Sequence, residues 1–280
     1  MCVNLASKKH RWDDNSAITK PRICTPAKIP QSREEILLHI TVIIPTYNEL
    51  KNLTAIAEAL FSLPLPDLKI LVVDDNSPDG TGVLARTLCE QFPGRMLVLE
   101  RSHKRGLGSA YLDGFQQTLK TGAEAIAQMD ADFSHPPEKL LELVDALSSC
   151  DVAMGSRYIP GGKLDDNWPL WRKGLSAFGN FYARSILRLP IRDTTGGFRV
   201  WRRSTLLALP LHRVSTNGYA FQIEIAYVAY KLGFKFREVP IYFADRRWGK
   251  SKMSLAIQME AAKGVWKMLW KYRDLTPLPG

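Results

Sequence analysis

Cysteines and long hydrophobic runs are both scarce in this sequence. Its four cysteines, Cys2, Cys24, Cys89 and Cys150, lie far apart, with no CxxC pair and no histidine at metal-ligand spacing. Neither a disulfide framework nor a zinc site is therefore indicated, and a reducing, cytoplasmic compartment is favoured. The first residues lack the apolar segment of a signal peptide, and no stretch approaches the ~18 uninterrupted apolar residues of a membrane span. We expect any contact with a membrane to be made from its surface.

Acidic residues are outnumbered by basic ones. The 280 residues include 38 Lys or Arg and 28 Asp or Glu, which gives a formal net charge of +10. A basic chain favours an anionic partner, which includes nucleic acid, a phosphate-rich substrate and acidic lipid headgroups. With 45% hydrophobic residues, the chain can bury a full core as one large α/β domain or two small ones.

Three parts are predicted along the chain. Residues 1–35 are rich in Lys, Arg and Pro and show no apolar periodicity. They are predicted to be a flexible basic arm, or a tail with no role beyond solubility. Residues 36–253 carry strand and helix patterns and are predicted to form the main domain. Residues 254–280 are predicted to be a C-terminal amphipathic helix and tail.

Short β-branched runs alternate with helical patterns from Ile40 onwards. ITVIIP, LKILVVDD, RMLVLE and AIAQMD are typical of strands, and helices are predicted at NLTAIAEALFSL, 81–92 and 107–120. This alternation predicts a mainly parallel sheet wrapped by helices. Ligands bind at the carboxyl ends of such strands, so we expect the chemistry at PTYNE, DDNSPDG and DAD. After Cys150 the pattern is less regular, apart from a helix near 219–232, and this half is predicted to be the acceptor side.

The triplet Asp130-Ala131-Asp132 directly follows the apolar run AIAQM. Alternation along an extended segment points both carboxylates to the same side, and the strand end places them at the mouth of the crevice. Two such oxygen ligands, with diphosphate oxygens completing the shell, suit Mg²⁺ or Mn²⁺. The alternative is a chance DxD triplet on a surface.

Two further strand ends carry residues suited to a nucleotide. Asp75 closes LVVDD, where it can accept hydrogen bonds from a base or ribose, and we favour it over Asp74 for this role. The alternative is that Asp75 is an aspartate of a turn, because NSPDG is a sequence typical of turns. In PTYNE, Tyr47 can stack on a base and Glu49 can accept from base or ribose, the alternative being a helix cap. RGLGSA can present backbone N–H groups to a phosphate at a helix start.

Cationic residues stand beside glycines in the second half of the chain. The residues are Arg157 in GSRYIPGG, Arg199 in TTGGFR, and Arg246, Arg247, Lys250 and Lys252 in DRRWGKSKM. Glycine lets the backbone approach a ligand, and guanidinium groups fit phosphate oxygens. Together they predict a second phosphate site, whereas any one of them alone is typical of a solvated surface.

The last helical stretch, SLAIQMEAAKGVWKMLWKYR, has an apolar stripe and a basic stripe. The basic stripe is Lys263, Lys267 and Lys271. The apolar one is Leu255, Met259, Ala262, Trp266 and Leu269. This pattern is typical of a basic interfacial helix with aromatic anchors, and equally of a helix docked on its own domain.

Seven strings occur in a fixed order over about 220 residues: PTYNE, VVDDNSPDGT, MDADFSHPP, GSRY, DTTGGFR, GYAFQIE and DRxxGxSKM. In this the sequence resembles the polyprenol-phosphate (dolichol-phosphate) mannose synthases. These are inverting glycosyltransferases of GT-A fold, a Rossmann-like, mainly parallel sheet with helices on both faces. The ordered set is far more specific than any single string.

The resemblance implies roles for individual residues. Residues implied to bind the guanosine half of GDP-mannose are Pro45, Tyr47, Glu49, Val73 and Asp75. Those implied to hold metal and diphosphate are Asp130, Ala131 and Asp132. Those implied to contact donor or acceptor phosphate, and counted with Asp132 as catalytic, are Arg157, Arg246 and Lys252. Arg199, also counted as catalytic, matches an arginine implied to meet the lipid phosphate. Gln222 and Glu224 lie in matching segments without an assigned role.

The implied reaction is transfer of mannose from GDP-mannose to a polyprenyl phosphate, with inversion at the anomeric carbon. Many bacterial relatives carry a membrane-spanning tail that is not seen here. The enzyme is therefore expected on the cytoplasmic face of a membrane, held by its own amphipathic helix or by a separate membrane-anchoring subunit.

Two rival functions remain at this stage. A related synthase using UDP-glucose or another UDP-sugar is less favoured, because DADFSHPP is closer to the mannose enzymes than to DADLQDPP. A basic nucleic-acid-binding α/β protein is disfavoured, because the cations are not gathered on one helix with interleaved aromatics.

Overall fold

A central sheet organises the molecule. The structure, a computed structural model, describes residues 38–245 and 255–279. Within them a seven-stranded sheet has the order β3-β2-β1-β4-β7-β5-β8. Its strands are β1 Ile40–Thr46, β2 Lys69–Asp74, β3 Met96–Glu100, β4 Ala125–Gln128, β5 Val152–Ser156, β7 Arg199–Arg202 and β8 Phe236–Pro240. All pair in parallel except β7, which runs antiparallel to β4 and β5. The predicted mainly parallel sheet is confirmed.

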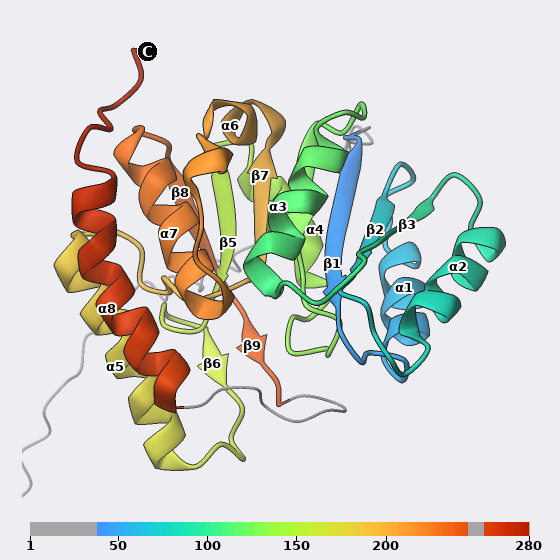
Figure 1. The fold of residues 1–280 in the computed structure, drawn as a ribbon, viewed down its shortest axis with the longest axis horizontal. Helices are drawn as coiled ribbons and strands as arrows, with labels where there is room; N and C mark the ends of the chain where they lie inside the picture. The colour runs from blue at the N-terminus through green and yellow to red at the C-terminus, as the bar shows by residue number, and fades with distance from the viewer. Residues whose placement is uncertain (1–37, 246–254, 280) are drawn as a thin grey trace, which may run out of the picture. The chain divides into compact units, whose positions relative to one another are not determined.

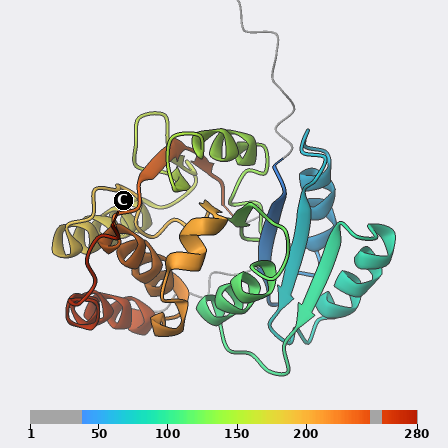
Figure 2. The ribbon, with the colours of Figure 1, turned by 90° about the horizontal axis from the view of Figure 1, so that it is seen from above.

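Helices lie on both faces of this sheet (Figures 1 and 2). They are α1 Leu53–Phe61, α2 Thr81–Gln91, α3 Leu107–Thr118, α4 Lys139–Ala146, α5 Leu170–Leu187, α6 Arg203–Ala208, α7 Gly218–Lys231 and α8 Leu255–Lys271. The helices predicted at 81–92, 107–120 and 219–232 correspond to α2, α3 and α7. Two short strands, β6 Lys163–Leu164 and β9 Tyr242–Phe243, form a separate parallel pair.

Alternate residues of the strands supply two separate cores. Ile43 and Val73 belong to a cluster with α3, α5, α7 and α8, whereas Val42 and Val72 belong to a cluster with α1, α2 and α4. This division follows from the two-residue period of a strand, which sends successive side chains to opposite faces. Both faces are buried, which explains the continuous apolar runs of the sequence.

The parallel register brings three strand ends to one edge of the sheet, the lower edge in Figure 1. Thr46 at the end of β1 pairs with Asp74 at the end of β2, and Ile43 pairs with Gln128 at the end of β4. The segments that follow these strands are therefore neighbours in space although they are far apart in sequence.

The helix α8 is docked on α5 and α7. Val265 and Met268 on this helix and Tyr272 just after it are buried, whereas Trp266 is 54% exposed and Trp270 is 71% exposed. The helix is thus docked on its own domain through a face one residue away from the predicted stripe, and the exposed Trp266 leaves the aromatic-anchor reading a prediction. No helix among the described residues has the length and apolar character to cross a membrane.

The chain boundaries predicted at residues 35 and 253 lie among residues that the structure does not describe, and they stay predictions. From Leu37 onwards the described residues belong to one compact unit.

Candidate active site

A cleft of about 380 Å³ opens where the strand ends meet. The sequence-predicted residues that line it are Pro45, Tyr47, Glu49, Asp75, Asp130, Ala131, Asp132 and Arg157. Further lining residues are Lys104, Gly106, Leu107, Ser134, His135, Thr195, Gly197, Asn217, Tyr219, Gln222 and Phe243. Eight predicted residues from four separate segments are thus brought together in one place.

Asp74 and Asp75 have different roles at the end of β2. The Asp74 carboxylate accepts hydrogen bonds from Thr46 Oγ1 at 2.8 Å and from Ser77 Oγ at 2.6 Å, which closes the turn beneath the cleft. Asp75 lines the cleft, as predicted. Its oxygens accept from the backbone N–H groups of Arg105 at 2.9 Å and Gly106 at 2.8 Å. Asp75 therefore holds the start of α3 against the cleft, and its contact with a base or ribose stays a prediction.

Tyr47 and Glu49 stand on the loop between β1 and α1. The ammonium of Lys104 lies 3.6 Å from the centre of the Tyr47 ring, so a cation covers one face of the ring. Glu49 accepts a hydrogen bond from the side-chain amide of Asn52 at 2.7 Å. Base stacking on Tyr47 would use the ring face away from Lys104.

Asp130 and Asp132 line the cleft in a tight turn after β4, where Phe133 has a φ of 63°. The phenol of Tyr111 donates to Asp130 Oδ1 at 3.2 Å. Ser134 donates to Asp132 Oδ1 from its hydroxyl at 2.6 Å and from its backbone N–H at 3.1 Å. Local hydrogen bonds thus fix the direction of both carboxylates.

His135 is the third polar support of this turn. Its Nδ1 accepts the backbone N–H of Asp130 at 3.0 Å, and its ring stacks on Phe198. Burial lowers the pKa of His135, although the charges of Asp130 and Asp132 oppose the shift. Burial also raises the pKa of Tyr111, helped by the charge of Asp130, so its phenol stays a hydrogen-bond donor.

The donor set fits a divalent ion that shares its shell with a ligand. Asp130 and Asp132 contribute hard oxygen atoms, as Mg²⁺ and Mn²⁺ prefer. No cluster of three or more acidic, His or Cys side chains suited to a metal occurs among the described residues. An ion held by the aspartate pair would need oxygens of a phosphate ligand to complete its shell.

Arg157 forms a buried ion pair at the cleft edge. Its Nε and Nη2 donate to the two oxygens of Asp193 at 2.7 and 2.6 Å, and Nη2 also donates to Thr195 Oγ1 at 2.7 Å. Burial disfavours the charged guanidinium, but the Asp193 carboxylate outweighs burial and raises the pKa of Arg157. Much of its donor capacity is thus used within the protein, and its contact with a phosphate stays a prediction.

Arg199 and Val73 do not reach the cleft wall. Arg199 is fully buried, and its Nη1 and Nη2 donate to the carbonyls of Gln222 at 2.8 Å and Thr194 at 3.0 Å. Burial lowers the pKa of Arg199 to about 10, with Asp193 opposing. Val73 is fully buried in the sheet. Arg246 and Lys252, with Arg247 and Lys250, lie outside the described residues.

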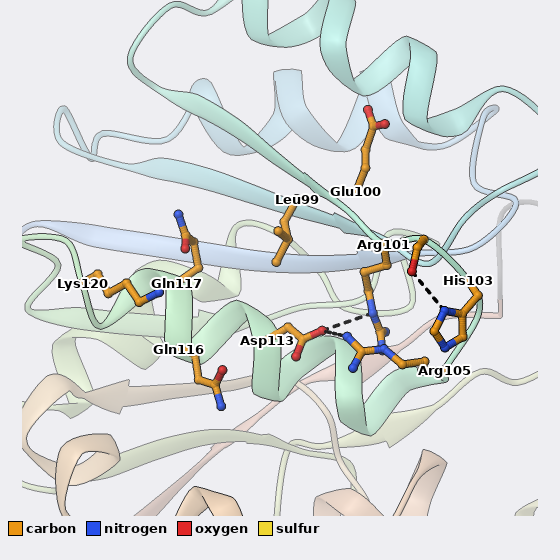
Figure 3. A pocket seen from close by; sticks show the side chains of 10 residues that line it. Leu99, Glu100, Arg101, His103, Arg105, Asp113, Gln116, Gln117 and Lys120 are labelled. Atoms are coloured by element: carbon orange, nitrogen blue, oxygen red, sulfur yellow. Dashed lines mark hydrogen bonds and ion pairs between the residues drawn. The ribbon is translucent and has the colours of Figure 1, made fainter.

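A second cavity lies beside β3 and α3 (Figure 3). Its volume is about 540 Å³, and polar side chains line most of it. Arg101 pairs there with Asp113 at 3.2 Å and, on its other side, with Asp75 at 3.0 Å. Arg105 also pairs with Asp113 there, so both arginines of the cavity are held in ion pairs, and Arg101 supports Asp75 from this side.

Sequence reasoning missed His135 and Tyr111 and gave Gln222 no role. His135 follows the aspartate pair by three residues, so proximity was a usable signal. Tyr111 lies on α3 and Gln222 on α7, and only the packing of these helices brings them to the cleft.

The model of glycosyl transferase family 2 matches residues 41–208. The polyprenol monophosphomannose synthase of Mycolicibacterium smegmatis is 48% identical over 76% of this chain and 80% of its own length. The undecaprenyl-phosphate mannosyltransferase of Micrococcus luteus is 41% identical over 85% of this chain and 98% of its own length.

A solved structure supports the fold. Glucosyl-3-phosphoglycerate synthase from Mycobacterium tuberculosis, crystallised with Mn²⁺, UDP-glucose and phosphoglyceric acid, matches 87% of this chain and 82% of that chain. Its TM-score is 0.59 and its sequence identity is 16%. At this identity the likeness shows the GT-A-like fold alone. The family model and the two relatives carry the assignment: the chain is an enzyme of glycosyltransferase family 2 and is similar to the polyprenyl-phosphate mannose synthases, as its ordered motifs predicted.

Proposed function

We propose that the enzyme transfers mannose from GDP-mannose to a polyprenyl phosphate, with inversion, giving polyprenyl-phosphate mannose and GDP. The observation that carries this proposal is the similarity, over most of both chains, to two enzymes named as mannosyltransferases of polyprenyl phosphates. The cleft supports it, because nucleotide-side and metal-side residues of the implied set line one cavity together with Arg157.

The acceptor needs no general base in this reaction. A phosphate monoester has a second pKa of about 6, so it is largely dianionic at neutral pH. In a single displacement, a phosphate oxygen forms a bond to the anomeric carbon, and the bond from that carbon to the GDP oxygen breaks. The protein's task is to bring two phosphate groups together and to orient the sugar between them.

Asp130 and Asp132 would hold the divalent ion, with Tyr111 and His135 fixing the first carboxylate and its backbone. When bound, Mg²⁺ or Mn²⁺ would stabilise negative charge on the leaving diphosphate. The start of α3 opens on the cleft at Gly106 and Leu107, and the positive end of a helix favours phosphate there.

Cations remain part of the proposal. Arg157, Arg246 and Lys252 are proposed to screen donor or acceptor phosphate, and Arg199 to act towards the lipid phosphate. For Arg199 the buried position supports an indirect action, through the carbonyls that it holds.

A panel assay tests the function. Purified protein is incubated with radiolabelled GDP-mannose, GDP-glucose or UDP-glucose and a short polyprenyl phosphate, with Mg²⁺, Mn²⁺ or EDTA. We expect a labelled lipid from GDP-mannose only, and none with EDTA. Transfer from UDP-glucose alone would assign the enzyme to the rival synthase group, and full transfer in EDTA would remove the metal from the proposal.

We further propose that α5 and α8 form a face that contacts the surface of a lipid bilayer. The two helices are joined where Tyr182 donates to the carbonyl of Ala262 at 3.2 Å and accepts from Trp266 Nε1 at 3.0 Å. Large apolar side chains exposed on them are Leu170, Trp171, Phe178, Phe181, Trp266 and Trp270. The exposed Lys263 and Lys267 stand among them, which suits an interface with anionic headgroups.

Sedimentation with liposomes tests this face. Binding to vesicles with anionic lipid is expected for the wild type and is expected to fall when Trp266 and Trp270 are replaced by Ala. Replacing Trp171 and Phe178 should have a similar effect, because they lie on the neighbouring helix. Val83→Ala, an exposed apolar residue on α2, is the matched control. Unchanged binding in both double variants would discard the face, and a separate anchoring subunit would then be favoured.

A further inference from the structure

The side-chain amide of Gln222 is buried in the cleft without a partner. The residue is 2% exposed and lines the cleft, and neither its Nε2 nor its Oε1 is hydrogen-bonded to any residue that the structure describes. Buried side-chain amides are nearly always paired, because an unmet donor or acceptor is costly. An amide held in this place points to a ligand that offers it both a donor and an acceptor.

A second donor lies close by, on His135. Because Nδ1 accepts the N–H of Asp130, the single proton of the neutral ring is on Nε2. No described residue accepts a hydrogen bond from that atom. Stacking on Phe198 and an edge contact with Phe243 hold the plane of the ring. The ring is 2% exposed and lines the same cleft.

The two side chains border one small space above Gly197. A Cβ atom added to Gly197 would lie 3.2 Å from Gln222 Nε2 and 3.4 Å from His135 Cε1. Glycine therefore keeps this space open. Arg199 fixes its two sides, because it binds the carbonyl of Gln222 on α7 and the carbonyl of Thr194 in the loop that leads to Gly197.

We propose that Gln222 and His135 recognise hydroxyl groups of the transferred hexose through hydrogen bonds. A hydroxyl both donates and accepts, so it can satisfy the amide oxygen and an N–H group at once. A phosphate oxygen only accepts and would leave Oε1 of Gln222 unmet. The hexose is attached to the diphosphate, so it lies in the cleft beside Asp130 and Asp132. The inference rests on the proposed function and adds the residues that determine sugar specificity.

Donor analogues that each lack one hydroxyl of mannose test the assignment. For the wild type, kcat/KM is expected to fall about tenfold for at least one deoxy analogue, the effect of losing one hydrogen bond. Gln222→Met, which keeps length and loses both polar atoms, is expected to be about tenfold slower with GDP-mannose. Its penalty for that same analogue should disappear, because the interaction is already absent.

His135 is tested by a variant that spares its support of Asp130. In His135→Asn the amide oxygen can take the place of Nδ1 as acceptor, while the outer N–H is lost. In this variant, the fall in kcat/KM for one deoxy analogue should vanish, and the Kd of GDP should be unchanged. Gln117→Met, on an exposed glutamine of α3 beside the second cavity (Figure 3), is the matched control and should keep the wild-type profile.

Calorimetric Kd values for GDP-mannose and its analogues separate this inference from the proposed function. If the wild type transfers no mannose, the proposed function fails, and the Kd values still report whether Gln222 recognises the sugar. Equal deoxy penalties in the wild type and in Gln222→Met would overturn the inference. A change confined to the KM for polyprenyl phosphate would also overturn it, because the amide would then serve the acceptor.

Discussion

The two walls of the cleft hold charged side chains in different ways. On the wall that follows β4, the carboxylate of Asp130 is held by the neutral phenol of Tyr111. On the opposite wall, Arg157 is bound through two nitrogen atoms to the carboxylate of Asp193. A neutral donor orients a charge and leaves it available, whereas an ion pair largely cancels it. The difference teaches that one wall presents a charge that the protein leaves unmatched, whereas the other presents a charge that the protein has largely matched itself.

The largest effect is expected from breaking the ion pair. Arg157→Ala leaves the carboxylate of Asp193 buried without its partner, and it should lower the free energy of unfolding by about 3–5 kcal/mol. Urea denaturation measures this. Lys163→Ala, which breaks an exposed pair with Asp166, should change stability little. If Arg157→Ala were as stable as the wild type, the ion pair would not hold this wall and the comparison of the walls would fail.

Asp132→Ala is expected to have the next largest effect, on catalysis. It removes one of the two proposed metal ligands and should slow transfer by about 100-fold or more, or ~3 kcal/mol of barrier, with the fold retained. Transfer rates at saturating Mn²⁺ measure the loss of catalysis, and thermal melting measures whether the fold is retained. The exposed Asp166→Ala is the control. Near wild-type transfer would reject the metal assignment.

Glu224 provides a pH test on the α7 side of the molecule. Although burial alone would raise its pKa, hydrogen bonds from Lys271, Thr216 and Tyr272 lower the pKa of Glu224 below 4.5. A depressed pKa means that its stabilisation is present above pH 4.5 and is lost as the pH falls through the folded value. Glu224→Gln should therefore cost about 1–3 kcal/mol at pH 7 and less near pH 3. A difference that does not depend on pH in urea titrations would contradict this.

Tyr111→Phe is expected to have the smallest effect. It removes one hydrogen bond to Asp130, worth about 1 kcal/mol, and should weaken Mn²⁺ binding in the presence of GDP about fivefold. Calorimetry measures the affinity. Tyr230→Phe, on an exposed tyrosine of α7, is the control. No change would show that the turn alone orients Asp130.

The first half of the fold and the gathering of aspartates at the cleft could be predicted from the sequence. ITVIIP and LKILVVDD are buried on both faces, so their apolar runs are continuous and end where the ligand-facing residues begin. Asp75 ends the second of these runs, and Asp130 and Asp132 directly follow the run AIAQM. Such local signals need no knowledge of distant residues.

The second half depends on contacts that no local pattern carries. β7 is set by its pairing with β4 and β5, far along the chain. The helix α5 was not predicted. Trp171, Phe178 and Phe181 are exposed on it, so its sequence lacks the usual pattern of an apolar buried face and a polar exposed face. Arg199 lies beside two glycines, which is typical of a phosphate site, and only the packing of α7 shows that its partners are carbonyls.

The buried carboxylate of Glu224 has a practical consequence for anyone engineering this enzyme. It accepts hydrogen bonds from Lys271 and Tyr272 near the end of α8, each at 2.7 Å, and from residues 215 and 216 just before the cleft. Deleting α8 to obtain a protein that is easier to handle in water would strip this acid of two partners and loosen the loop before Asn217. Replacing the exposed Trp266 and Trp270 with polar residues would make the protein easier to handle in water. It would leave the hydrogen bonds from Lys271 and Tyr272 to Glu224 in place.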